Sequence, residues 1–133
     1  MNFLLDTNIC IYLMKHRSAS VARHIESLRV GDVAISAITL AELEHGIGSD
    51  PGIAPKRREQ LEKLLAFIPA LDFDDAAARS YGELRSRAIH LGRNRFDTLI
   101  AAHAISRKLV LVTNNTKDFS DIDALVLENW VEG

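Results

Sequence analysis

Four acidic residues of this chain lie near short apolar runs, where folding could bring their carboxylates together. They are Asp6, Glu42, Asp97 and Asp118. Several carboxylates at one point repel each other by about 4 kcal/mol per close pair near a surface. A hard divalent cation removes this repulsion, because Mg²⁺ and Mn²⁺ prefer carboxylate and water oxygens as ligands. The four acids are therefore candidate metal ligands or catalytic groups.

Each acid also has a purely structural interpretation. Asp6 could cap the helix that follows it, and Glu42 could complete a capping box that opens at Thr39. Asn94 and Asp97 could form a second capping box. For any one acid alone the structural interpretation is the more common, so the chemical one depends on the acids meeting in space.

Helical periodicity supports Asp97 more strongly than Glu42. Asp97 lies on the line of Ala101 and Ile105 in a segment with almost no polar face, where an ionised carboxylate is costly unless it is paired or binds a metal. At 100° per residue, Glu42 lies about 130° from the apolar stripe of its helix, and Glu44 lies nearer to that stripe. Periodicity alone does not choose between the two glutamates.

The chain alternates short apolar runs with longer amphipathic stretches. Strands are expected at 3–5, 33–35, 70–73, 109–112 and 125–127. Helices are expected at 7–15, 19–28, 39–48, 56–67, 74–91 and 96–106. Strands that alternate with helices and are apolar throughout predict a single α/β domain over 1–133, with a parallel sheet covered on both faces. Ligands of such sheets bind beyond the carboxyl ends of the strands, where these acids lie, and Thr113 and Asn115 would orient bound water there.

Other common site motifs are absent from the sequence. The five histidines have no zinc-ligand spacing, and no H-E-x-x-H or cysteine pair is present. A P-loop and a serine-nucleophile motif are missing. The glycines at 46, 48 and 52 have the wrong spacing for a dinucleotide site. The acids remain the best candidates for chemistry.

Composition excludes a protein that coats nucleic acid through its overall charge. The chain has 133 residues, 47% of them hydrophobic, and a net charge of -2, so contact with RNA or DNA needs a local basic patch. Arg85, Arg87, Arg93 and Arg95 form such a cluster next to Asp97. A second cluster, at 56–58, is equally well explained as a solvated face. Arginines beside an acidic metal site suit a phosphodiester substrate.

The sequence favours a cytoplasmic protein without a membrane anchor. Cys10 is the only cysteine, so no internal disulfide requires an oxidising compartment. Its apolar neighbours predict a small buried side chain. No signal peptide is recognisable, and no apolar run approaches the ~20 residues that span a bilayer.

Four motifs in order resemble those of the PIN-domain ribonucleases, and specifically of VapC-type toxins from type II toxin–antitoxin systems. They are Leu-Leu-Asp-Thr-Asn at 4–8, Thr-Leu-Ala-Glu-Leu at 39–43, Phe-Asp-Thr-Leu-Ile-Ala at 96–101 and Val-Thr-Asn-Asn-Thr-Lys-Asp-Phe at 112–119. The similarity extends over essentially the whole chain. Each motif alone is weak, but four in the right order and spacing are specific.

The resemblance implies a PIN-like, five-stranded parallel sheet flanked by helices and a Mg²⁺- or Mn²⁺-dependent endoribonuclease that inhibits translation and growth. Transfer RNA is a plausible target. It also implies a homodimer, a cognate VapB-type antitoxin whose carboxyl-terminal segment obstructs the active site, and a larger toxin–antitoxin complex. By position, Asp6, Glu42 and Asp97 match the family's metal-binding acids, which favours Glu42 over Glu44. The family's fourth acid is replaced by Asn115 here, and Asp118 is an alternative for that place.

On this interpretation Asp6 and Asp97 hold the ion and Glu42 orients or deprotonates the attacking water, leaving a 5′-phosphate. Two enzyme alternatives fit less well. A receiver domain needs an acidic pair after the first strand, and a haloacid-dehalogenase-like phosphatase needs a second aspartate where Asn8 stands. A catalytically silent binding partner is the third alternative, which metal binding would discriminate.

Overall fold

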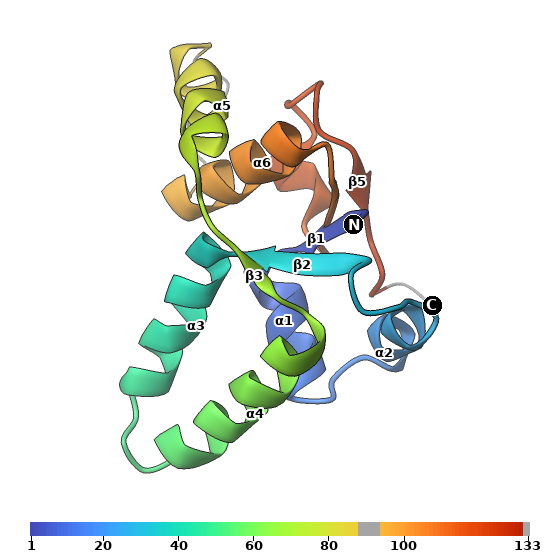
Figure 1. The fold of residues 1–133 in the computed structure, drawn as a ribbon, viewed down its shortest axis with the longest axis vertical. Coiled ribbons are helices and arrows are strands. Elements are labelled where there is room, and N and C mark those ends of the chain that lie inside the picture. The colour runs from blue at the N-terminus through green and yellow to red at the C-terminus, as the bar shows by residue number, and fades with distance from the viewer. Residues whose placement is uncertain (88–93, 132–133) are drawn as a thin grey trace.

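Five short parallel strands form one sheet in the order β3-β2-β1-β4-β5. The computed structural model describes residues 1–87 and 94–131, and Figure 1 shows the sheet crossing the middle of the molecule. The strands are β1 (Phe3–Leu5), β2 (Val33–Ser36), β3 (Ala70–Leu71), β4 (Val110–Val112) and β5 (Leu127–Glu128). The expected parallel α/β fold is therefore confirmed.

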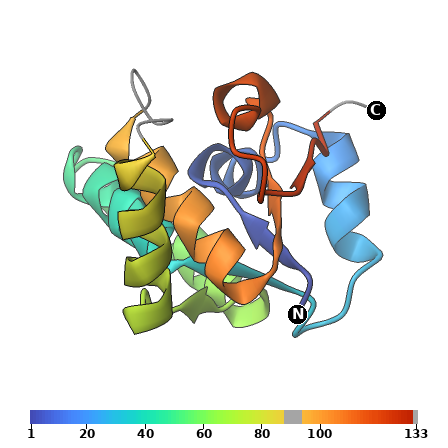
Figure 2. The same ribbon diagram turned by 90° about the horizontal axis from the view of Figure 1, so that it is seen from above.

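Helices cover both faces of the sheet (Figures 1 and 2). They are α1 (Thr7–Met14), α2 (Ala19–Glu26), α3 (Ala37–Gly48), α4 (Ala54–Phe67), α5 (Asp75–Ser86) and α6 (Arg95–Arg107), with a 3-10 turn η1 (Thr116–Phe119). None of the helices in the described ranges is long and apolar enough to cross a bilayer.

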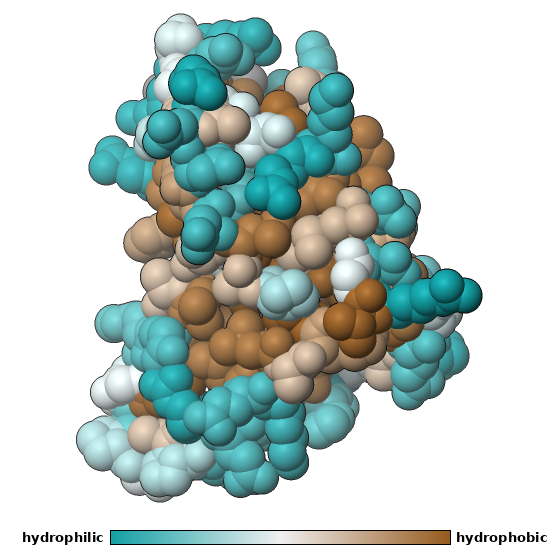
Figure 3. Space-filling view, viewed as in Figure 1, coloured by the Kyte–Doolittle hydropathy of each residue, from teal (hydrophilic) through white to brown (hydrophobic). Residues whose placement is uncertain are grey.

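The alternation of side chains along the central strand divides the core in two. Leu4 packs with residues of α5, α6 and η1, whereas Leu5 packs with residues of α1, α2 and α4. Cys10 is fully buried in the second cluster, as the sequence predicts. Both faces of the central strand are thus apolar, as a parallel sheet covered by helices requires. In Figure 3, hydrophobic side chains form a band between the hydrophilic ends of this view.

Several element boundaries differ from those that the sequence predicts. The third helix begins at Ala37, two residues before Thr39, because Ser36 rather than Thr39 is its N-cap. The fifth ends at Ser86 instead of near position 91; the remaining predicted positions from 88 onward lie outside the described residues. The third and last strands are shorter than expected, at 70–71 and 127–128. None of these shifts changes the order of elements.

Candidate active site

Asp6 lies at the centre of the carboxyl edge of the sheet. It follows β1, and its backbone amide donates to the carbonyl of Val112 in β4 at 3.0 Å. Its Oδ1 accepts from the amide of Ile9 at 2.9 Å, so the residue also caps α1. The structural and chemical interpretations of Asp6 are therefore compatible, because the cap uses one carboxylate oxygen.

The environment of Asp6 shows that other negative charges are close. The side chain is 6% exposed. Burial raises the pKa of Asp6 to about 6, although hydrogen bonds from Thr113 and Ile9 lower it, and the negative charges of Asp97 and Glu42 raise it further. The fold thus places two of the other predicted acids, Glu42 and Asp97, within electrostatic reach of Asp6.

Glu42 is held by a hydroxyl of α1. The Thr7 Oγ1 donates to Glu42 Oε1 at 2.6 Å, and it lies 3.3 Å from Thr39 Oγ1. The expected capping box is wrong, because Thr39 is buried inside α3 and the Ser36 hydroxyl accepts from Ile38 N at 3.0 Å. Glu42 therefore takes no part in capping α3, and its charge lies close enough to Asp6 to raise the pKa of that residue.

Glu44, the other glutamate that periodicity allows, lies on the surface. Arg58 Nη1 donates to Glu44 Oε2 at 2.7 Å. In the same basic segment, Arg57 donates to the carbonyl of Gly46 at 2.7 Å, near the end of α3. Two residues of the basic cluster at 56–58 therefore have structural partners.

Asp97 occupies the first turn of α6 and is partly buried. Asn94 is the N-cap, and its Oδ1 accepts from Phe96 N at 2.8 Å. The amino-terminal end of α6 lies near Asp6, because the negative charge of Asp97 raises the pKa of Asp6. Anionic groups are favoured at a helix amino terminus by its dipole, so α6 is a stable support for this carboxylate.

Thr113 connects β4 to Asp6. The side chain is buried and hydrogen-bonded to the Asp6 carboxylate, and its Oγ1 accepts from Asn115 N at 3.0 Å. The sequence predicts that Thr113 orients bound water. In the structure its hydroxyl contacts the Asp6 carboxylate directly. Asn115 and Asp118 are both exposed, beside η1 and within it. Neither is among the groups that shift the pKa of Asp6.

Two further partners were missed by reasoning from the sequence. Thr7 is not among the predicted site residues, although its place directly after Asp6 is a usable signal. Asn114 Nδ2 donates to the Tyr12 hydroxyl at 3.1 Å, tying the segment after β4 to α1. No local pattern indicates that contact, because the two residues are separated by 102 positions.

The donor set fits a hard cation that keeps part of its water. In residues 1–87 and 94–131, no three acidic, histidine or cysteine side chains are arranged to hold an ion directly. Burial is the main cause of the raised pKa of Asp6, and the nearby negative charges of Asp97 and Glu42 add to it, so a cation here would neutralise a local concentration of negative charge. Mg²⁺ commonly binds through one or two carboxylates and retains several waters, so it does not require three directly coordinating side chains.

Glu42 also borders two hollows. One, of about 410 Å³, is lined by Ala41, Glu42, His45 and Phe96. The other, of about 210 Å³, lies between α1, α3 and α4 and contains Thr7, Arg57 and Gln60 among its lining residues. The Phe96 side chain is 48% exposed, so an aromatic face and a carboxylate share the first hollow.

Comparison with known proteins identifies close relatives of the whole chain. Residues 3–125 match the PIN domain. The chain is 40% identical over 133 residues to the tRNA(fMet)-specific endonuclease VapC of Shigella flexneri, covering 98% of both chains. The structure superposes with a TM-score of 0.88 on VapBC2 from Rickettsia felis bound to a promoter DNA fragment, at 37% identity over 98% of this chain and 99% of that one. DNA-bound VapBC from Salmonella typhimurium gives a TM-score of 0.89 at 32% identity, with 98% of both chains covered.

Proposed function

The chain belongs to the PIN-domain family, and from that premise we propose that it is the endoribonuclease toxin of a toxin–antitoxin pair, using Asp6, Glu42 and Asp97 to bind a divalent metal ion. The observation that carries this proposal is the shared electrostatics of the three acids, since Asp97 and Glu42 both raise the pKa of Asp6. Its VapC relatives include one named as a tRNA(fMet)-specific endonuclease. Cleavage of an RNA phosphodiester is therefore the reaction that the site serves.

The three central acids have different proposed roles in cleavage. Asp6 and Asp97 would hold Mg²⁺, or Mn²⁺ in its place, while the Ile9 and Thr113 hydrogen bonds fix the Asp6 carboxylate. Glu42 would orient the attacking water and accept its proton, and Thr7 fixes one of the Glu42 oxygens. When bound, the ion supplies charge stabilisation on the phosphoryl oxygens and a more acidic water. Attack by water predicts a 5′-phosphate on the downstream product.

The fourth acidic place belongs to Asp118 or Asn115. Both follow β4 at the carboxyl edge of the sheet, and Asp118 N donates to the carbonyl of Asn115 at 3.0 Å. Asp118 carries a charge that could contact the ion through water, whereas Asn115 offers a neutral oxygen. We propose Asp118 as an auxiliary catalytic residue with a smaller contribution than the three central acids.

We infer that the RNA backbone is bound beside the start of α6. Arg85, Arg87 and Arg95 are exposed there; Arg93 of the predicted cluster lies outside the described residues. Arginine forms bidentate hydrogen bonds with phosphate, so this cluster complements a polyanion next to acids that bind a cation. A transfer RNA is the substrate class that the relative's name supports.

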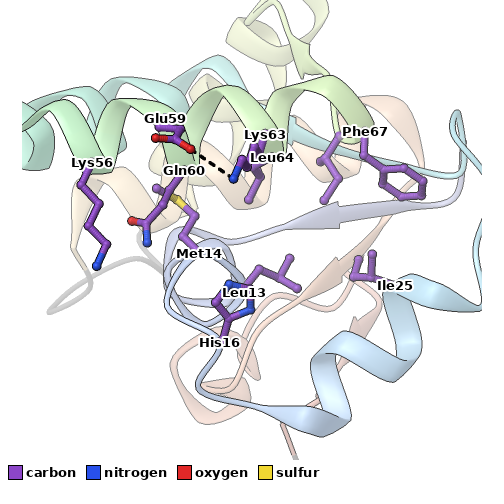
Figure 4. Close-up of a pocket in the computed structure, with 11 residues that line it drawn as sticks. Leu13, Met14, His16, Ile25, Lys56, Glu59, Gln60, Lys63, Leu64 and Phe67 are labelled. Atoms are coloured by element: carbon purple, nitrogen blue, oxygen red, sulfur yellow. Dashed lines mark ion pairs between the residues drawn. The ribbon is translucent and has the colours of Figure 1, made fainter.

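We propose that the antitoxin binds a groove between α1, α2 and α4, whose lining residues Figure 4 shows. Apolar side chains of Leu13, Ile25 and Phe67 line this space of about 410 Å³. Lys56 and Lys63 also line it along α4, and Lys63 is paired with Glu59 at 3.2 Å. The groove shares Met14 and Gln60 with the hollow that contains Glu42. An amphipathic segment with acidic residues fits these lining groups, and its continuation would cover Glu42.

We further propose that residues 1–133 act as a single nuclease domain, that the toxin is a homodimer within a larger complex, and that it works in the cytoplasm. The matched PIN family spans residues 3–125, which is most of this chain. The buried, solitary Cys10 suits a reducing compartment. Light scattering of the purified toxin, alone and with its antitoxin, measures both assemblies.

Cleavage of a synthetic RNA with Mg²⁺, with Mn²⁺ and with excess EDTA tests the proposed function. Asp6→Asn, Glu42→Gln and Asp97→Asn should each lower the rate by at least about a hundredfold. Glu44→Gln is the matched control, because Glu44 lies two residues from Glu42 but pairs with Arg58 on the surface. Full activity in EDTA, or equal rates for the two glutamine variants, would overturn the assignment. A chain that binds RNA and metal without cleaving would instead be a binding module.

A further inference from the structure

A buried histidine joins the two helices that carry Glu42 and Asp97. His103 lies on α6 and Ser36 is the N-cap of α3, and neither side chain is exposed to solvent. His103 Nδ1 lies 2.7 Å from Ser36 Oγ, within hydrogen-bond distance. The same Ser36 oxygen accepts from Ile38 N at 3.0 Å. The imidazole therefore contacts the atom that caps the first turn of α3.

This contact lies at the same sequence distance from both acids. Glu42 follows Ser36 by six residues (42 − 36), and Asp97 precedes His103 by six (103 − 97). Six residues of α-helix extend about 9 Å. The bond therefore joins α3 to α6 about 1.7 helical turns from the backbone of each acid, and a hydrogen-bonded helix transmits a shift over that length.

An imidazole is a costly way to fill this space. Its Nε2 makes no hydrogen bond of ordinary geometry within the part of the chain that the structure describes, although the Asp72 carbonyl is close enough to raise the pKa of His103. Phe73 packs edge-on against the ring, with 5.3 Å between centroids. A buried polar atom without a partner costs roughly 1–3 kcal/mol, which an apolar side chain would avoid. Leucine could make neither the 2.7 Å contact with Ser36 nor the weaker one with the Asp72 carbonyl, and only the Ser36 contact reaches α3.

The charge state of His103 is consistent with such a fixed contact. Burial lowers the pKa of His103, as does the Arg107 guanidinium, whereas the Asp74 carboxylate and the Asp72 carbonyl act in the opposite direction. The neutral ring therefore predominates at neutral pH. A neutral imidazole can donate to or accept from a serine hydroxyl without introducing a charge into the core.

We propose that His103 is a positioning residue of the nuclease site, which acts through Ser36 to fix α3 against α6 and thereby the separation of the Glu42 and Asp97 carboxylates. The inference rests on the proposed function. Asp6 is held independently by Ile9 and Thr113. Loss of the bond should therefore alter how Glu42 and Asp97 act together while leaving the Asp6 carboxylate in place.

Two isosteric variants separate positioning from general stability. Asparagine places its amide nitrogen near Nδ1 of the replaced imidazole, whereas glutamine places it near Nε2. His103→Asn should keep the Ser36 contact and His103→Gln should lose it. Ser36→Ala removes the same contact from the α3 side, so the test does not depend on the folding of a single variant.

Ser20→Ala is the control for loss of a buried long-range hydrogen bond. Ser20 Oγ donates to the Trp130 carbonyl at 2.6 Å and joins α2 to the carboxyl-terminal segment, away from the acids. The experiment uses the full-length protein. It measures Mn²⁺ affinity by calorimetry, kcat and KM for RNA cleavage, and Tm by thermal unfolding. His103→Gln and Ser36→Ala should lose about tenfold in Mn²⁺ affinity and kcat, with KM changed less than about twofold. His103→Asn should stay within about threefold of the unmodified protein.

Ser20→Ala should lower Tm without changing Mn²⁺ affinity. The positioning role is overturned if His103→Gln and Ser36→Ala bind Mn²⁺ as the unmodified chain does, or if Ser20→Ala loses as much affinity as they do. Failure of the proposed function gives a different result, because Asp97→Asn would then cleave RNA and bind Mn²⁺ normally.

Discussion

The hydroxyl of Thr7 donates to Glu42 Oε1 at 2.6 Å, so the first residue of α1 fixes a carboxylate on α3. Thr7 directly follows Asp6, and one short segment therefore supplies a proposed metal ligand and the group that orients a second acid. The contact also lies beside Thr39 Oγ1, at 3.3 Å from Thr7 Oγ1. Two threonines and a glutamate form a polar contact between helices that are otherwise packed through apolar side chains.

Thr7→Val should separate orientation of Glu42 from stability. Valine keeps the shape of threonine but cannot donate to the carboxylate, so Glu42 would sample other rotamers. We expect kcat for RNA cleavage to fall about tenfold, with KM nearly unchanged. Thr7→Ser keeps the donor and should retain most activity. Equal kcat values for the valine and serine variants would exclude an orienting role for this hydroxyl.

Cys10 should be inert toward thiol reagents in the folded protein. Its side chain is fully buried, and burial raises the pKa of the Cys10 thiol well above its ordinary value, with the nearby Asp6 charge acting in the same direction. The thiolate is the reactive form. A chromogenic disulfide should therefore label the native protein only at the rate of unfolding and label it at once in denaturant. Rapid native labelling would contradict this packing.

A charge reversal in the proposed antitoxin groove should weaken the toxin–antitoxin complex. Lys56 lines the groove near Met14 and Gln60. Lys56→Glu would oppose acidic residues of the partner and raise its dissociation constant by roughly tenfold. Lys108→Glu is a control of equal charge change at a helix end outside this groove. Calorimetry with the purified antitoxin measures both, and equal weakening by the two substitutions would show a nonspecific charge effect.

The sequence predicted the convergence of the acids because parallel strands end at one edge of a sheet. Asp6 follows β1 directly, and Asp97 begins the helix that leads into the neighbouring β4. Those placements depend only on strand order and helix direction. They do not require any prediction of side-chain contacts.

The sequence could not choose Glu42 over Glu44 by periodicity, because the group that distinguishes them is distant in the chain. Thr7 holds Glu42 from 35 residues away, whereas Arg58 holds Glu44 at the surface. The capping prediction failed for the same reason. Ser36 and Thr39 are both suitable caps locally, and Thr39 is instead buried beside Thr7. Tertiary contacts decided both cases.

Asp6→Asn should stabilise the metal-free protein at neutral pH. The carboxylate is 6% exposed, and the pKa of Asp6 is raised from 3.8 to about 6. A group whose pKa is higher in the folded state binds its proton more tightly there. Its contribution is therefore favourable below about pH 4, and it is lost as the pH rises through about 6. Ionisation at pH 7 would then cost about 2–3 kcal/mol, at 1.36 kcal/mol per pKa unit.

The asparagine variant avoids that cost and keeps an oxygen that can accept from Ile9. In EDTA, its Tm should exceed that of the unmodified chain at pH 7, and the difference should narrow as the pH falls toward about 4. Mn²⁺ should reverse the order at pH 7, since it stabilises only a protein that can bind it. Thermal melts of both proteins at three pH values, with EDTA and with Mn²⁺, measure this. A lower Tm for Asp6→Asn in EDTA at every pH would show that the carboxylate supports the fold instead of opposing it.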